Sequence, residues 1–160
     1  MNFTVDKANN KINVEREFAA SIDKVWAAWT QAELLDQWWA PRPWMAKTKT
    51  MDFKVGGHWL YAMVSPEGQA HWCRVDYKSI TPQKNYSALD AFCDENGTPA
   101  QPAFPNSLWN NTFSNRGDST TLVSIEITYE SLEALENIIK MGFQGGFTMC
   151  MANLDELLSQ

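Results

Sequence analysis

The sequence predicts an α+β fold, in which an antiparallel sheet packs against helices. Six segments between residues 47 and 129 are rich in strand-forming residues and are separated by turn residues. Apolar residues at helical spacing occur only on either side of this region, after the first strand and at the C-terminal end. A run of strands flanked by helices is typical of α+β proteins. The 160 residues contain no repeat, low-complexity tract or linker, so we expect one domain spanning residues 1–160.

The N-terminal elements are a strand and two short helices. Residues 11–18 alternate apolar and polar side chains, which predicts a strand in which Arg16 is the one charged member of the apolar set. Ser21 suits the N-cap of a helix over residues 22–30. A second short helix is expected over residues 31–39, because two prolines follow it and prevent its continuation.

Strand candidates then follow in close succession, each bounded by Gly, Pro, Asn or Asp residues that favour turns. They cover residues 47–55, 58–64, 70–80, 85–93, 107–114 and 119–129. Together with the N-terminal strand, they predict a sheet of about six or seven antiparallel strands. The proline-rich residues 98–106 separate two of these strands, and we expect a loop there that forms a lid at a cavity mouth.

The C-terminal segment, residues 132–159, predicts a long helix that covers one face of the sheet. Apolar residues recur there every three or four positions, so that one stripe of the helix faces the sheet. The stripe consists of Phe143, Phe147, Met151, Leu154 and Leu158. Gly142, Gly145 and Gly146 are poor helix formers, so we expect a break between a short helix and a long one at these glycines.

The strand candidates at residues 58–64 and 70–80 should pair as a hairpin across the turn SPEGQ. This turn places Val64 opposite Ala70 and fixes which residues share a face. One face holds the charged residues, with His58 and Asp76 as an expected surface contact. The other face, which we expect to lie toward the helix, carries Trp59, Tyr61, Met63, His71, Cys73, Val75 and Tyr77.

Most of these inward side chains have apolar bodies and polar tips, whereas a purely structural core is usually rich in Leu, Ile and Val. Aromatic residues with a few polar groups are typical of a pocket for a small molecule. Large rings that only fill a wide gap between helix and sheet would produce the same pattern. The residue pattern alone does not distinguish a ligand pocket from a core filled by large rings.

No catalytic or metal-binding motif stands out in the chain. His58 and His71 are expected on opposite faces of the hairpin, which separates the ligands that a zinc site would need. His71 and Cys73 are about 7 Å apart along one strand, too far for direct proton transfer. Asp90 interrupts an apolar strand, and we expect it on the solvated outer face. These motifs therefore predict no metal, no cofactor and no catalytic residue.

Composition narrows the classes of partner. A net charge of −6 and a pI of about 4.8 argue against nucleic acid as a main partner. No apolar run approaches the roughly 18 residues that a membrane span needs, and the polar N-terminal residues do not resemble a signal peptide. The three cysteines, Cys73, Cys93 and Cys150, lack CxxC spacing, which favours reduced thiols and a cytoplasmic location.

Several motifs together resemble one superfamily. They are VWAAWT at residues 25–30, WWAP at residues 38–41, VGG at residues 55–57 and the GF-containing last helix. Over residues 11–158 the chain resembles the START-like superfamily, also called the SRPBCC or birch-pollen-allergen-like helix-grip group. Within it, the chain is most similar to the family named for the C-terminal domain of the activator of heat-shock protein 90 ATPase. The resemblance implies a curved antiparallel sheet wrapped around a long C-terminal helix.

The resemblance also implies a function, because relatives in this superfamily hold lipids, sterols or polyketides between sheet and helix. We therefore expect non-catalytic binding of a hydrophobic or aromatic small molecule in such a cavity. The residues expected to line it are Trp39, Trp59, Tyr61, Met63, His71, Cys73, Trp109, Phe143, Phe147 and Met151. One alternative is a co-chaperone or stress-response domain whose acidic surface meets a chaperone. Another is a cyclase-like enzyme that uses His71 and Tyr61.

The segment DQWWAPRPW, residues 36–44, holds three of the eight tryptophans. Trp38 follows the apolar side of the short helix, so we expect it in the core. Trp39 and Trp44 fall outside that side, at the place where this fold type opens its cavity. Both are therefore candidates for the cavity rim, and the alternative for Trp44 is that it caps the edge of the sheet.

Overall fold

The computed structural model describes residues 1–99 and 107–160, which form one eight-stranded antiparallel sheet and four helices. The strands are β1 (Asn2–Asp6), β2 (Lys11–Phe18), β3 (Met45–Met51), β4 (His58–Val64), β5 (Ala70–Thr81), β6 (Asn85–Cys93), β7 (Ser107–Asn115) and β8 (Thr121–Tyr129). The helices are α1 (Ile22–Thr30), α2 (Ala32–Leu35), α3 (Leu132–Lys140) and α4 (Phe143–Leu158). The predicted α+β class and the helix-grip arrangement are confirmed. Most of the proline-rich segment expected as a lid lies outside the described residues.

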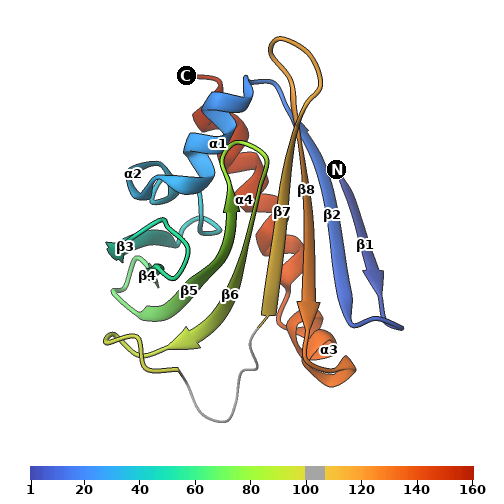
Figure 1. The fold of residues 1–160 in the computed structure, drawn as a ribbon. Coiled ribbons are helices and arrows are strands. Elements are labelled where there is room, and N and C mark those ends of the chain that lie inside the picture. Colours follow the sequence, from blue (N-terminus) through green and yellow to red (C-terminus); the bar gives the residue numbers. More distant parts are fainter. Residues whose placement is uncertain (100–106) are drawn as a thin grey trace.

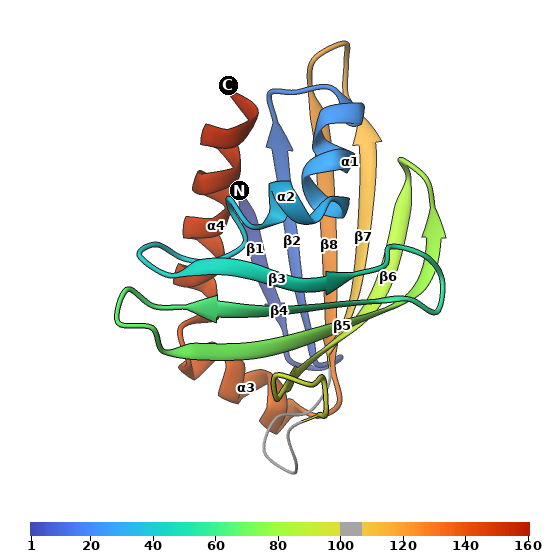
Figure 2. The same ribbon diagram turned by 90° about the vertical axis from the view of Figure 1, so that its left-hand side faces the viewer.

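The sheet is strongly curved. Its strand order is β1-β2-β8-β7-β6-β5-β4-β3, in which all neighbours are consecutive in sequence except β2 and β8. In Figure 2, β3, β4 and β5 run across the direction of β1, β2, β8 and β7. The helices α1 and α2 connect β2 to β3, and α4 runs along the concave side of the sheet (Figure 1). The sheet therefore wraps around α4, as the prediction of a gripped helix requires.

The eighth strand, β1, is one more than the sequence predicted. It pairs with β2 at one edge of the sheet and places Phe3 opposite Val14. Phe3 and Val5 alternate with polar residues, but only Phe3 packs against the core. A five-residue edge strand that is mostly exposed gives little alternation of burial, and its polar composition hid it.

β3 begins and ends earlier than the predicted residues 47–55. A turn takes the place of its expected end, closed by a hydrogen bond from the Gly57 N–H to the Lys54 carbonyl at 2.8 Å. Gly56 has a φ of +84° in this turn, and a Cβ added at Gly57 would lie 2.1 Å from the Asp52 carbonyl oxygen. Glycine is the residue that suits both positions. VGG therefore belongs to the turn between β3 and β4 and not to the strand.

The predicted register of the β4–β5 hairpin is confirmed. Val64 pairs with Ala70, and Tyr61 pairs with Cys73. On the outer face, however, the carboxylate of Asp76 is bonded to Arg74, whose Nε lies 3.1 and 3.0 Å from its two oxygens. An arginine fork matches a carboxylate with two parallel donors, which explains why this pair replaces the expected contact with His58.

The helices follow the predicted start and break signals. The hydroxyl of Ser21 accepts a hydrogen bond from the Lys24 N–H at 3.5 Å and caps α1 as predicted. α2 is shorter than the expected residues 31–39, because the chain continues beyond it in turns. Gly142, with a φ of +87°, separates α3 from α4, whereas the two following glycines lie within α4. The predicted break therefore depends on one glycine out of three.

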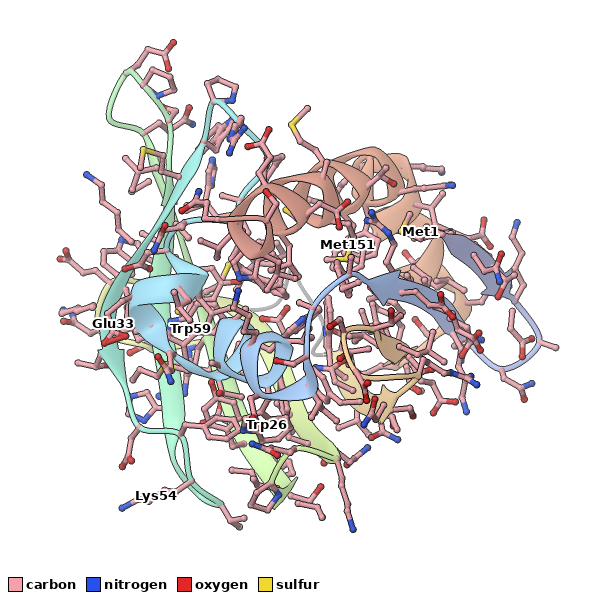
Figure 3. The ribbon with its side chains drawn as sticks, turned by 90° about the horizontal axis from the view of Figure 1, so that it is seen from above. Met1, Trp26, Glu33, Lys54, Trp59 and Met151 are labelled. Carbon is pink, nitrogen blue, oxygen red and sulfur yellow. The ribbon has the colours of Figure 1, made fainter. Side chains whose placement is uncertain are left out.

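Polar contacts hold α4 within the curve of the sheet, where it lies beside α1 (Figure 3). Arg16 of β2 forms an ion pair with Asp155 of α4, and its guanidinium carbon lies 5.2 Å from the ring centroid of Phe18. The buried amide of Asn153 donates to the Ala40 carbonyl at 3.0 Å. Arg16, the one charged residue in the apolar set of β2, therefore fastens the last helix to the sheet.

Candidate functional site: an aromatic cavity between sheet and C-terminal helices

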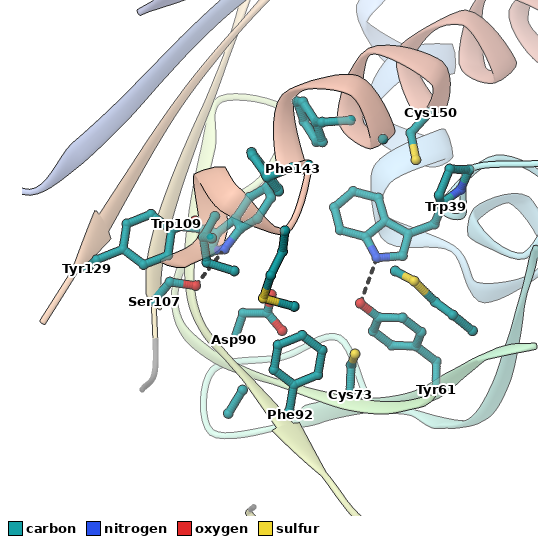
Figure 4. A pocket seen from close by; sticks show the side chains of 18 residues that line it. Trp39, Tyr61, Cys73, Asp90, Phe92, Ser107, Trp109, Tyr129, Phe143 and Cys150 are labelled. Atoms are coloured by element: carbon teal, nitrogen blue, oxygen red, sulfur yellow. Dashed lines mark hydrogen bonds between the residues drawn. The ribbon is translucent and has the colours of Figure 1, made fainter. Parts of the chain in front are cut away.

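A cavity of about 270 Å³ lies between the inner face of the sheet and helices α3 and α4 (Figure 4). Strands β4 to β8 supply one wall, and the two helices supply the other. Its lining consists of Trp39, Pro41, Tyr61, Met63, Cys73, Asp90, Ala91, Phe92, Ser107, Trp109, Tyr129, Ile138, Met141, Gly142, Phe143, Gly146, Phe147 and Cys150. Met141 and Gly142 line the cavity and are also exposed, so the junction between α3 and α4 lies at its mouth.

Trp39 lies at the centre of the aromatic side chains around the cavity and contacts several of them. Its ring centroid lies 5.8 Å from those of Trp59 and Trp109 and 6.4 Å from that of Phe147. Phe143 stacks on Phe147 at 5.2 Å, which extends the wall along α4. These rings come from the loop after α2, from β4 and β7 and from α4, so the wall links the sheet to the last helix.

Few polar groups interrupt the wall, and most of them are already bonded to each other. The Nε1–H of Trp39 donates to the Tyr61 hydroxyl at 2.8 Å, and the Nε1–H of Trp109 donates to the Ser107 hydroxyl at 3.0 Å (Figure 4). Tyr61 lies opposite Cys73 in the β4–β5 pairing. Burial raises the pKa of Tyr61 and that of Cys73 well above their usual values, and a nearby carboxylate adds to the rise. Both groups are therefore uncharged near neutral pH.

That carboxylate belongs to Asp90, which is the only Asp, Glu, Lys, Arg or His that the described part of the chain contributes to the lining. Burial raises the pKa of Asp90 to about 7, and a hydrogen bond from the backbone N–H of Ala91 opposes the rise. The acid points into the cavity rather than to solvent (Figure 4). The expectation that Asp90 lies on the solvated outer face is therefore wrong.

A β-bulge explains this placement. The β5–β6 register shifts between Tyr77 and Ser79, so that Lys78 is an extra residue without a partner on β6. An unbroken register counted from the turn would place Asp90 opposite Asp76, on the outer face. The bulge moves it opposite Val75, on the inner face, because a shift of one residue exchanges the two faces of a strand.

Seven of the ten residues expected at the site do line the cavity. They are Trp39, Tyr61, Met63, Cys73, Trp109, Phe143 and Phe147. The side chains from β4 and β5 reach it because the hairpin register and its inner face follow the prediction. Those from α4 reach it because the predicted apolar stripe faces the sheet.

The other three expected residues, Trp59, His71 and Met151, lie outside the lining. Trp59 stacks behind Tyr61 at 4.0 Å and supports the wall from the core side. Met151 is 0 % exposed and packs in the core further along α4. His71 is exposed near the end of the hairpin, where its ring lies 5.3 Å from that of Trp44. His71 and Tyr61 therefore do not converge on the cavity, and Trp44 is not part of its lining.

Sequence reasoning missed several lining residues that carried a signal. Cys150 follows Phe147 by three positions and so lies on the same side of the helix. Phe92 shares its parity with Asp90, and the unnoticed bulge concealed the facing of both. The residues from α3 and from its junction with α4 had no signal, because their position depends on how the two helices meet.

The described residues offer neither a metal centre nor an activated thiol. Within residues 1–99 and 107–160, no group of three or more His, Cys, Asp or Glu side chains could hold a metal ion. Burial raises the pKa of Cys93 to about 11 and that of Cys150 to about 12, so these thiols carry no charge near neutral pH. The arrangement is chemically suited to holding an apolar body and to contacting a polar group at Asp90. In the same part of the chain, no helix is long and apolar enough to cross a membrane.

Comparison with known proteins gave one family and many structures. The family model described as activator of Hsp90 ATPase homolog 1-like protein matches residues 19–159. A crystal structure of a Mycobacterium smegmatis protein is 26% identical, with a TM-score of 0.89 over 99% of this chain and 96% of that one. A solution structure from Arthrobacter aurescens is also 26% identical, with a TM-score of 0.92 over 99% and 91%. One from Staphylococcus epidermidis is 27% identical, with a TM-score of 0.84 over 98% and 94%. No curated protein matched the sequence.

Proposed function

The chain belongs to the family described as activator of Hsp90 ATPase homolog 1-like protein, and on that premise we propose that it binds a hydrophobic or aromatic small molecule without converting it. The proposed site is the cavity between the sheet and the C-terminal helices. The observation that carries the proposal is the lining itself, in which aromatic and aliphatic side chains surround a single acid. Concave sites of this composition are typical of small-molecule binding.

The size of the cavity narrows the class of ligand. Its volume of about 270 Å³ lies just below the roughly 300–1,000 Å³ of typical ligand pockets. Apolar surface that leaves water contributes roughly 25 cal/mol per Å², so a ligand gains most when its whole body fits inside. We therefore favour a compact ring system, such as a small polyketide-like compound, over a long-chain lipid.

The test is a titration of the purified protein with compact bicyclic aromatic probes and with fatty acids. Trp39 and Trp109 belong to the lining, so a bound probe should quench their fluorescence in a saturable way. A probe at 100 times its Kd should also stabilise the folded state by about 2.7 kcal/mol, visible as a rise in Tm. If no probe of either class produces saturable quenching or a Tm shift, the proposal fails.

Two variants locate the binding. Gly146 lines the cavity, and a Cβ added there meets only the Pro41 side chain, at an ordinary 3.8 Å. Gly145 is exposed, and a Cβ there meets nothing within 4 Å. Gly146→Leu should fill the cavity and abolish the quenching, whereas Gly145→Leu adds the same side chain to the same helix and should bind normally. Equal binding by both variants would place the ligand elsewhere.

The second candidate function is a co-chaperone domain, which the family description favours. The net charge of −6 suits a basic patch on a chaperone. A cytoplasmic location, which this candidate requires, is supported by the free thiols of Cys73, Cys93 and Cys150. Stimulation of Hsp90 ATPase activity by the purified chain would favour this candidate, especially if high salt removes the effect. An unchanged ATPase rate at low salt would count against it.

A further inference from the structure

Asp90 is an acid without a basic partner in an otherwise apolar cavity. The ion pairs found among the described residues join other side chains and lie away from the cavity lining. No lysine, arginine or histidine among residues 1–99 and 107–160 lines the cavity. Asp90 is half-buried, because it borders the cavity. A carboxylate withdrawn from bulk water without a cation beside it is costly, and proteins usually supply either a basic side chain or a metal to it. Here the cavity leaves room for a ligand to fill that role.

The other titratable groups around the acid are neutral near pH 7. They are Tyr61 of β4, Cys73 of β5, Cys93 of β6, Tyr129 of β8 and Cys150 of α4, and burial raises the pKa of each. Neighbours on β7 and α3, namely Ser107 and Ile138, do not titrate. The charge of the lining therefore changes with pH only at Asp90.

The indole donors of the lining are already bound to other protein atoms. Trp39 donates to Tyr61 and Trp109 donates to Ser107. The carboxylate of Asp90 receives a hydrogen bond from the Ala91 backbone, which leaves further acceptor positions free. A ligand that enters this cavity thus meets aromatic faces and one strong acceptor, but no basic group to receive an anion.

We propose that Asp90 is the anchor for a ligand that joins a compact aromatic or apolar body to a protonated amine. This inference deepens the proposed function and rests on it. The amine would donate to the carboxylate in a charge-assisted hydrogen bond, the strongest type available in such a site. The surrounding rings add to the preference, because a cation is attracted to the face of an aromatic ring. A fatty acid or another carboxylate ligand would face Asp90 without a counter-charge and is disfavoured.

Three probes with the same ring system but different charge test the proposal. They are the cationic 1-naphthylmethylamine, the neutral 1-ethylnaphthalene and the anionic carboxylate 1-naphthaleneacetate. Their affinities are measured by tryptophan quenching and calorimetry at about pH 8, above the pKa of Asp90. The amine should bind at least about tenfold more tightly than the neutral probe, and the acid should bind most weakly. Lowering the pH to about 5 should remove the amine's advantage, because Asp90 is then protonated.

The matched variants are Asp90→Asn, which keeps the shape of the side chain, and Asp118→Asn, which removes the same charge from an exposed turn. Asp90→Asn should bind the amine no more tightly than the neutral probe, and its affinity for the neutral probe should be unchanged. Asp118→Asn should bind all three probes as the unaltered protein does. Retention of the amine preference in Asp90→Asn, or no preference in the unaltered protein, would overturn the inference while the proposed function stands. Failure of all three probes, and of the fatty acids, to bind would instead refute the proposed function.

Discussion

The carboxyl group of Asp90 lies in an apolar cavity, where its charged form loses much of the hydration that water would give it. The pKa of about 7 means that the folded chain holds a proton over a pH range in which the unfolded chain has already released it. Proton binding by the folded state alone makes stability depend on pH. The same acid that would anchor a ligand therefore makes the empty protein less stable as the pH rises.

The first prediction concerns this loss of stability at high pH. Between about pH 4 and pH 7 the unfolded state binds fewer protons, so the free energy of unfolding should fall by up to about 1.4 kcal/mol per pH unit. Above pH 7 both states are ionised and the loss stays constant. Asp90→Asn removes this dependence and should gain up to about 4 kcal/mol relative to the unaltered protein between pH 4 and pH 8. Urea unfolding of both proteins at the two pH values measures the difference, and parallel pH profiles would contradict the placement of Asp90.

At the scale of elements, the sheet determines which side chains reach the cavity. The β4–β5 hairpin was predictable, because a short turn fixes its register and aromatic residues mark its inner face. Which face of the sheet the β6 side chains occupy could not be predicted. The bulge at Lys78 in β5 leaves no mark in the sequence, because the strand alternates normally on either side of it. Because of one extra residue in β5, Asp90 faces the cavity and not the solvated face on which it was expected.

The second prediction concerns the junction of α3 and α4. It compares the effects on stability of alanine substitutions at two nearby glycines, Gly142 and Gly145. Gly142 has a φ of +87°, which an L side chain adopts at a cost of about 1–2 kcal/mol, so Gly142→Ala should destabilise the protein by about that amount. Gly145 lies in α4 with open space around it, so Gly145→Ala should stabilise the protein by about 0.5–1 kcal/mol. Chemical denaturation measures both effects. A Gly142→Ala variant as stable as the unaltered protein would show that the break between the helices does not depend on Gly142.

At the scale of the whole molecule, the cavity results from the mismatch between a curved sheet and a straight helix. Local sequence patterns predict the two faces that meet, and seven lining residues followed from them. The volume left between the faces depends on the curvature of eight strands and on the angle at which α3 meets α4, which no local pattern encodes. For the same reason the sequence could not distinguish rings that fill a gap, such as Trp59, from rings that surround a space, such as Trp39.

The third prediction follows from the way the interior is connected. Buried side chains from the sheet, from α1 and from α4 form one cluster, in which Trp29, Trp38 and Trp39 contact each other and Trp39 contacts Phe147. Loss of either the helices or the sheet would expose the same core. We therefore propose that the chain is a single cooperative domain, whose unfolding in urea follows one transition. Tryptophan fluorescence reports the core and far-ultraviolet circular dichroism reports the backbone, so the two curves should coincide. Two separate midpoints would show that the core and the backbone structure are lost in separate steps.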